Sequence, residues 1–524
     1  MATYNLALVL KNASTEPQFL LIKQTPPPKF CNLEYDSFVD SHLYDLPSSM
    51  LNFLDGDTVE PAALIHGLDS LLEKIDYRNY DLQLAINRAL EQVGVNATEV
   101  KDWSFFKFVE EAEFGPGLPI HTIYFTGNLE SNDGNLPEVC RWMSIQSCLN
   151  QLLHVKPSSD RVGPLVVIGV INDLVQSPQS KVNTSLHRQE YPPGVTLIPM
   201  KTRTAKPFRT TNMVIFAPQS VSNDCENSSF VACGDALIVD PGCLSDLHDE
   251  LLKIVAALSR KLVVFVTHHH RDHVDGLSVI QKCNPNAILL AHENTMRRIG
   301  KGDWSLGYTS VAGGEDICIG GERLKVVFAP GHTDGHVALL HVSTHSLIVG
   351  DHCVGQGSSL LDIQSGGNMT DYFQSTYKFI DLAPHALIPM HGRINLWPKH
   401  MLCTYLKNRR SREKDILKAI ENGAKKLIDI VASVYSEVDR RLWIPAASNV
   451  QLHVNHLAQQ NKLPKEFSVK KFERSCKLHF FAWWMWEYLS SGILTRYKNL
   501  NKFKLVFAGV AGFAVFYSVS DNLK

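Results

Sequence analysis

Four potential metal ligands stand directly after an apolar run, and this combination limits what the chain can fold into. The run covers residues 262–266, and Thr-His-His-His-Arg-Asp-His follows at 267–273. We expect the run to be a buried strand, which delivers the loop rigidly and lets alternate residues point the same way. Three imidazoles and a carboxylate held this closely are costly to bury unless a cation lies among them. The four are His268, His270, Asp272 and His273.

Three further potential ligands follow in similar settings. His332 stands in Ala-Pro-Gly-His-Thr-Asp-Gly-His at 329–336, Asp351 follows the apolar run 346–350, and His391 follows 387–390. Each comes after a short apolar segment and beside Gly or Pro residues that can turn the chain. A surface loop that is merely His-rich does not explain this repeated order. Imidazole and carboxylate ligands suit zinc, which binds them at about 2 Å, so the sequence predicts a metal site.

This ordered set resembles the metallo-β-lactamase superfamily over about residues 195–400, with Ile-Val-Asp-Pro-Gly at 238–242 similar to its first motif. The resemblance implies an α/β fold, an αβ/βα sandwich with two facing mixed sheets, helices outside and the site at the strand ends. Asp240 would brace the loop without binding metal. Of two zinc ions, one would be held by His268, His270 and His332 and the other by Asp272, His273 and His391, with Asp351 bridging them.

The predicted ligands indicate hydrolysis. Two zinc ions lower the pKa of a bridging water toward ~7 and so supply hydroxide at neutral pH. They also stabilise the charge that develops on an attacked carbonyl or phosphoryl group. Asp272 is the expected catalytic residue, because its carboxylate could orient the water and accept its proton. Oxidative chemistry with iron is an alternative, but it needs an electron partner for which the sequence has no signature.

The whole chain is expected to contain two or three domains, since it has 524 residues. Its net charge of −2 gives no overall attraction to nucleic acid. The 11 cysteines include no Cys-x-x-Cys pair, and the N-terminus shows no secretory signal. We therefore expect reduced thiols and a location on the cytoplasmic side, not secretion.

Residues 1–175 are predicted to form a separate α/β domain, with strands at 6–10, 19–23 and 121–126 and a helix at 81–93. The stretch 85–95 resembles a degraded Nudix box, in which Glu91 remains and Gln92 stands where a second carboxylate belongs. This implies a non-catalytic module for binding, regulation or homo-oligomerisation. An α/β extension without a ligand is the alternative. The polar stretch 176–193 reads as a linker, and the catalytic domain is expected at 194–400.

Residues 401–470 are predicted to be a small helical, winged-helix-like domain, with helices at 402–424, 425–434 and 449–460 after a turn at 443–445. The span 195–465 resembles the β-lactamase-like protein 2 group, which are metallo-β-lactamase-fold endoribonucleases. The resemblance is carried by 329–336, by Gly-Asp-His-Cys-Val-Gly-Gln-Gly at 350–357 and by Asn-Arg-Arg-Ser-Arg-Glu at 408–413. It implies that single-stranded RNA is the partner. Because the basic cluster follows the last metal ligand, we expect Arg409, Arg410 and Arg412 to grip the RNA phosphates. The alternative is a solvated helix face.

Residues 471–524 form an aromatic and apolar tail. Six aromatic or Met side chains crowd into 480–486, and an uncharged run at 505–519 would rise about 22 Å as a helix. With a basic flank before it, this segment is a candidate tail anchor for an organelle membrane. The alternative is a terminal helix that docks on the protein itself.

Three functions follow from these features. The first is a zinc-dependent endoribonuclease acting on single-stranded RNA. The second is a thioester hydrolase of the hydroxyacylglutathione hydrolase type, because both reactions need the same metal centre. The third lies outside enzymology and is a membrane-tethered binding scaffold whose metal centre is vestigial.

Overall fold

The computed structural model describes residues 2–14, 16–31, 33–54, 65–129, 136–172, 184–218, 229–259 and 261–476. It divides into two compact units, described here in turn. The first contains most residues up to Cys403, and the second contains those from Thr404 onward with two short earlier segments. Residues 176–183 of the predicted linker and 477–524 of the predicted anchor lie outside the described residues. Among the described helices, none is both long and apolar enough to cross a bilayer.

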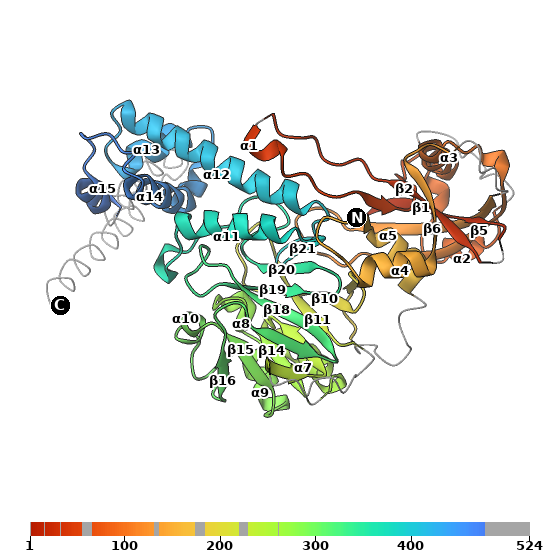
Figure 1. Cartoon of the computed structure of the whole chain (residues 1–524), viewed down its shortest axis with the longest axis horizontal. Helices are drawn as coiled ribbons and strands as arrows, with labels where there is room; N and C mark the ends of the chain where they lie inside the picture. The colour runs from red at the N-terminus through yellow and green to blue at the C-terminus, as the bar shows by residue number, and fades with distance from the viewer. Residues whose placement is uncertain are drawn as a thin grey trace, which may run out of the picture. The chain divides into compact units, whose positions relative to one another are not determined.

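The N-terminal region is built on an eight-stranded sheet (Figure 1). Its strands are β1 (Thr3–Asn12), β2 (Gln18–Lys23), β3 (Leu43–Asp45), β4 (Ser48–Met50), β5 (Val100–Val109), β6 (Ile120–Leu129), β7 (Cys140–Ser144) and β8 (Arg161–Val162). The main path runs β5-β6-β1-β2-β3-β8, with β1 and β6 parallel along their whole length. The helices include α1 (Leu33–Asp36), α2 (Leu68–Leu72), α3 (Leu82–Val93), α4 (Ile145–Leu153) and α5 (Pro164–Val166).

Helix α3 has the ends that its sequence encodes. The Asp81 side chain accepts the Leu84 N–H at its start, and Gly94 ends it with a φ of 68°. Its apolar face, including Ile86 and Leu90, packs into a core with β1 and β6. Gln92 donates to the Ser48 carbonyl at 2.7 Å. This is an additional α/β region of undefined type, and its Nudix-like character stays a prediction.

Two sheets follow and form an α/β sandwich. The seven-stranded sheet has the order β16-β15-β14-β13-β11-β10-β9, and the six-stranded sheet has the order β12-β17-β18-β19-β20-β21. The first comprises β9 (Gln189–Glu190), β10 (Val195–Lys201), β11 (Thr210–Phe216), β13 (Ala236–Val239), β14 (Leu262–Phe265), β15 (Ile288–Ala291) and β16 (Tyr308–Ser310). The second comprises β12 (Phe230–Gly234), β17 (Asp316–Ile319), β18 (Glu322–Phe328), β19 (Val337–His341), β20 (Ser346–Gly350) and β21 (Ala386–Pro389).

Successive side chains of a strand point to opposite faces of the sheet, so one strand contributes to two cores. In β14, Val263 and Phe265 enter the core between the two sheets, whereas Leu262 and Val264 face an outer core. That outer core contains α7 (His248–Ala257) and α9 (Leu277–Cys283), which lie on the outer side of the seven-stranded sheet (Figure 1). Because both faces of this strand are buried, its sequence is continuously apolar. Further helices of the unit are α8 (Arg271–Val274), α10 (Glu293–Met296) and most of α11 (Met369–Leu382).

The second unit is helical in its described part. It contains most of α12 (Pro398–Glu421), followed by α13 (Leu427–Val434), α14 (Trp443–Gln459) and α15 (Val469–Ser475) around one apolar core. The predicted turn at 443–445 is wrong, because α14 already begins at Trp443. Pro445 fits the first turn of a helix, where its missing N–H would have no intrahelical partner.

Candidate metal centre

Strand β14 carries the His-rich loop to the edge of the sandwich. All four of its residues are buried, and the loop begins immediately after it and leads into the short helix α8. Gly242, in the neighbouring loop after β13, permits this arrangement: a Cβ there would lie 1.7 Å from the Asp272 carbonyl oxygen. The two loops therefore approach each other more closely than any side chain would allow.

Asp240 fixes the protons on two histidines of this loop. Its carboxylate accepts the Thr267 N–H at 2.8 Å and the Thr267 hydroxyl at 2.6 Å, and it lies 2.9 Å from His273 Nδ1. His273 therefore donates from Nδ1 and keeps a lone pair on Nε2. The Thr267 oxygen, having given its proton to Asp240, accepts from His268 Nδ1 at 3.0 Å. Both imidazoles thus turn Nε2 toward the site, and in the neutral ring this nitrogen carries the lone pair that can bind a metal ion.

The same logic orients two more of the five histidines in the predicted ligand set. His391 Nδ1 donates to the Thr210 carbonyl at 2.9 Å, and His332 Nδ1 donates to the Leu360 carbonyl. Backbone carbonyls are acceptors only, so each of these rings must carry its proton on Nδ1. Nε2 is left as the metal-binding atom in each case.

Four ligand atoms surround one point. His391 Nε2 lies 3.3 Å from Asp272 Oδ2 and 3.4 Å from Asp351 Oδ1. His273 Nε2 lies 3.8 Å and 3.5 Å from the same two oxygens. Ligands placed tetrahedrally at about 2.1 Å from an ion are about 3.4 Å apart. His273 Nε2 is buried and has no hydrogen-bond partner, so the geometry fits a divalent cation.

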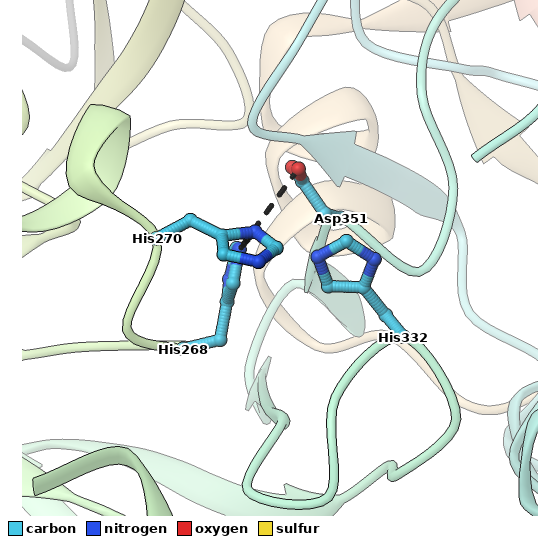
Figure 2. Close-up of side chains that lie close together, drawn as sticks. All are labelled: His268, His270, His332 and Asp351. Carbon is cyan, nitrogen blue, oxygen red and sulfur yellow. Dashed lines mark hydrogen bonds and ion pairs between the residues drawn. The ribbon is translucent and has the colours of Figure 1, made fainter. Parts of the chain in front are cut away.

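A second group contains His268, His270, His332 and Asp351, whose ligand atoms all lie within 4.8 Å of one another. Figure 2 shows these four side chains converging, with Asp351 facing His268 and His270. His268 Nε2 is 2.9 Å from His270 Nδ1 and 4.0 Å from Asp351 Oδ2. Asp351 thus offers one oxygen to each group, which is the arrangement that a dinuclear centre requires.

The electrostatics also require positive charge among these residues. Burial would raise the pKa of Asp351, but the charges of His391 and His273 hold it well below its usual value. Burial likewise raises the pKa of Asp272, yet His273 and His391 bring it down to about 2. Burial lowers the pKa of His391, while Asp351 and Asp272 raise it to about 10. Protons or a metal ion must therefore compensate the two carboxylates.

Several functional neighbours have no obvious signal in the sequence. Asn212, buried in β11, donates from Nδ2 to the Pro389 and Gly392 carbonyls, both at 2.8 Å, and so shapes the His391 loop. The Phe208 ring lies 5.4 Å from the His391 ring, and Thr204 Oγ1 lies 3.5 Å from its Nε2. Only long-range packing brings these residues together.

The three arginines predicted to bind phosphates do not share one surface. Arg409 is buried and donates to Asn449 Oδ1 at 2.8 Å, which corrects its placement on an open face. Arg412 is partly buried, donates to the Val434 carbonyl at 3.0 Å and lies over the Tyr435 ring. Arg410 is exposed. The spacing of the basic residues does not indicate that α12 directs the Arg409 side chain into the interior.

Known protein families give the same description of the fold. Residues 225–391 match the Metallo-beta-lactamase superfamily, and residues 427–468 match the Beta-lactamase associated winged helix domain. The superfamily match thus covers the segment that contains every residue of the two His/Asp groups described above, and the winged-helix match follows it along the chain. A fold of this kind with a His/Asp metal site is that of a metal-dependent hydrolase. The donor atoms do not identify the metal, so zinc remains a prediction.

Individual relatives are distant. A Beta-lactamase-like protein 2 homolog of Drosophila melanogaster is 27% identical over 43% of this chain and 76% of its own length. A Hydroxyacylglutathione hydrolase of a Synechococcus strain is 33% identical over 24% of this chain and 47% of its own. A solved beta-lactamase domain protein from Burkholderia ambifaria, at 19% identity, covers 58% of this chain and 97% of that one, with a TM-score of 0.45.

Proposed function

We propose that the protein is an endonuclease that hydrolyses phosphodiester bonds in single-stranded RNA at this metal centre. The observation that carries the proposal is a cationic loop beside the metal ligand His391. The loop, residues 202–209, joins β10 to β11 and exposes Arg203, Lys206 and Arg209. Within the described part of the chain, none of the three is engaged in an ion pair.

Two features place this cationic loop at the metal centre. Thr204 and Phe208, which alternate with the exposed cations, contact the imidazole of His391. On the other side, burial raises the pKa of Asp275, and the charges of Arg271 and Arg203 oppose that rise. Arg203 therefore lies near α8 and the His-rich loop. Three exposed cations on one loop beside the metal ligand suit a substrate with repeated negative charge.

The residues of the centre have distinct roles in the proposed reaction. Metal ions held by these ligands would supply hydroxide near neutral pH and stabilise the charge on phosphorus-bound oxygens. Asp272, ionised because its pKa is about 2, can accept a hydrogen bond from the attacking water and orient it. Asp240 keeps His273 in one tautomer throughout. The cationic loop would hold phosphates without reading bases.

A thioester hydrolase is the second candidate. The relative named Hydroxyacylglutathione hydrolase supports it, although this chain spans less than half of that protein's length. The small anionic groups of a glutathione thioester could bind to the same cationic loop. The metal ligands are compatible with both reactions, since attack on phosphorus and attack on a carbonyl carbon need the same centre.

One experiment separates these candidates. Metal-loaded protein would be incubated with a labelled single-stranded RNA and, separately, with a hydroxyacylglutathione thioester. Asp351→Ala would be the control lacking a ligand. We expect RNA cleavage that a chelator and Asp351→Ala both abolish. Thioester turnover without RNA cleavage would replace the proposal with the second candidate, and turnover of neither substrate by metal-loaded protein would refute both.

A further inference from the structure

The loop that carries His391 is tightly constrained on its inner side. β21 ends at Pro389, and Gly392, with a φ of 90°, turns the chain just after the ligand. A Cβ on Gly392 would lie 2.8 Å from the Gly355 Cα, so a side chain there would displace the loop. The Gly355 N–H also donates to the His391 carbonyl at 2.7 Å. Small movements of residues 391–393 therefore move a metal ligand.

The outer side of this loop is held by the N-terminal region. Arg393, two residues after His391, forms a two-pronged ion pair with Glu111, from Nε to Oε1 at 2.6 Å and from Nη2 to Oε2 at 2.9 Å. Glu111 lies between β5 and β6, and its Oε2 also accepts the Ile120 N–H at 2.6 Å. Arg393 donates in addition to the Leu118 carbonyl at 2.7 Å. Forked, charge-assisted pairs of this kind define geometry as well as adding energy.

The segment around Glu111 is part of the sandwich core and not a peripheral contact. Ala112 and Phe114 are each 1% exposed and belong to the same core as Val214 and Phe216 of β11. The Phe114 carbonyl lies 3.5 Å from the Thr210 hydroxyl. Since the Thr210 carbonyl is the acceptor for His391 Nδ1, this segment reaches the metal ligand through a single residue.

The chain after Arg393 is anchored to the N-terminal region at two further points. Arg161, buried in β8, donates to the His385 carbonyl at 3.1 Å and to the Leu396 carbonyl, and its guanidinium lies over the Trp397 ring. Asp40 accepts the Lys399 and His400 N–H groups at 2.8 and 3.0 Å, where α12 begins. These contacts bracket the segment 391–400.

We propose that the N-terminal region is a positioning part of the metal centre, and that the Glu111–Arg393 pair holds His391 in place for the ion shared by Asp272, His273, Asp351 and His391. The catalytic centre is then not complete within residues 194–400. Residue 111 acts through Arg393 and touches no reacting atom. Loss of the pair should weaken binding of that ion more than binding of the other, because the other ligand group contains no residue of the His391 loop.

The test is a titration of the metal-free full-length protein with Zn²⁺ against a chromophoric chelator. Glu111→Ala is the main variant, His391→Ala shows which equivalent depends on this ligand, and Glu113→Gln is the matched control. Glu113 is exposed, lies in the same segment and is without a polar partner among the described residues. We expect the Glu111→Ala protein to bind one equivalent as the wild type does and the other about 10-fold more weakly, the usual effect of removing a residue that supports a ligand.

Conservative variants keep the test decisive if Glu111→Ala folds poorly. Glu111→Asp keeps both carboxylate oxygens for Arg393 and should restore part of the affinity, whereas Arg393→Lys, which cannot form the fork, should not. Unchanged binding of both equivalents in Glu111→Ala and Arg393→Lys would overturn the proposal. So would an equal weakening of both equivalents, which would indicate a general effect on stability, or wild-type protein that binds only one ion.

Discussion

His336 accepts a hydrogen bond at Nε2 from the backbone N–H of Asp351, across 3.2 Å. Its Nδ1 donates to the Ala329 carbonyl at 3.0 Å, and the ring is completely buried. Burial lowers the pKa of His336 to about 3, so the ring is neutral. It can therefore donate from one nitrogen and accept at the other. Gly350, with a φ of 57°, makes room for the ring: a Cβ there would lie 2.3 Å from Nε2. The second histidine of Pro-Gly-His-Thr-Asp-Gly-His therefore positions the residue placed to bridge two ions.

We expect His336→Leu to lower the free energy of unfolding of the metal-free protein by about 2–4 kcal/mol. The substitution leaves the Asp351 N–H and the Ala329 carbonyl buried without partners, at about 1–3 kcal/mol each. His336→Gln, which can donate and accept, should recover part of this. Urea unfolding measures the stability, and metal analysis should show reduced content in His336→Leu. A leucine variant with full stability and full metal content would contradict this role.

The ligands could be predicted from the sequence because each follows an apolar strand that its own neighbours reveal. His268 follows a strand of the seven-stranded sheet, whereas Asp351 and His391 follow strands of the six-stranded sheet. The local patterns mark each strand end, and the packing of the two sheets brings these ends together. The contacts that hold them could not be predicted in this way. Glu111 and Arg393 are 282 positions apart, and nothing near either residue in the sequence indicates a partner. The exposure of Arg409 could not be predicted for a related reason, since charge patterns do not show which cation of a helix its own unit will bury.

Replacing Arg409 should lower the stability of the protein far more than replacing Arg410, although the two residues are adjacent. Arg409 is 6% exposed, donates to Asn449 and lies over the Tyr372 ring, so Arg409→Ala should destabilise the protein by about 2–3 kcal/mol. Arg410→Ala should change stability by no more than about 1 kcal/mol, because Arg410 is exposed and lies over the Phe373 ring at 5.7 Å. Thermal unfolding checks both values. If RNA runs along this helix, only Arg410→Ala should weaken RNA binding without affecting stability.

If the cationic loop binds RNA phosphates, its three charges should contribute to the salt dependence of RNA binding. Each cation that neutralises a phosphate of a single strand contributes about 0.7 to the slope of log Kd against log salt concentration. Replacing Arg203, Lys206 and Arg209 together by Gln should therefore lower that slope by about 2. Filter binding at several salt concentrations measures it, with exposed Lys301→Gln as a control for total charge. Equal slopes for the triple variant and the wild type would remove the loop from the binding surface.

The winged-helix unit contains a buried histidine whose titration should make it sensitive to acid. His453 is fully buried, and its Nδ1 lies 3.2 Å from Glu413 Oε2. Burial lowers the pKa of His453 below 6.5, Glu413 opposes this, and the charges of Arg409 and His456 add to the lowering. Glu413 does not titrate in the same range: burial would raise its pKa, but its bonds to His453 and His456 bring it to about 2.

The sign of the effect follows from the lowered pKa of His453. The unfolded chain takes up a proton at this residue near pH 6.5, whereas the folded unit does so only at lower pH. Stability from this group is thus complete above pH 6.5 and declines as the pH falls toward the folded pKa, by at most about 1.4 kcal/mol per pH unit. His453→Gln cannot titrate, so its unfolding free energy should decline less between pH 6.5 and 5.0. Urea unfolding of both proteins across this range isolates the difference, because all other groups are shared. Parallel declines would show that His453 is not the group responsible.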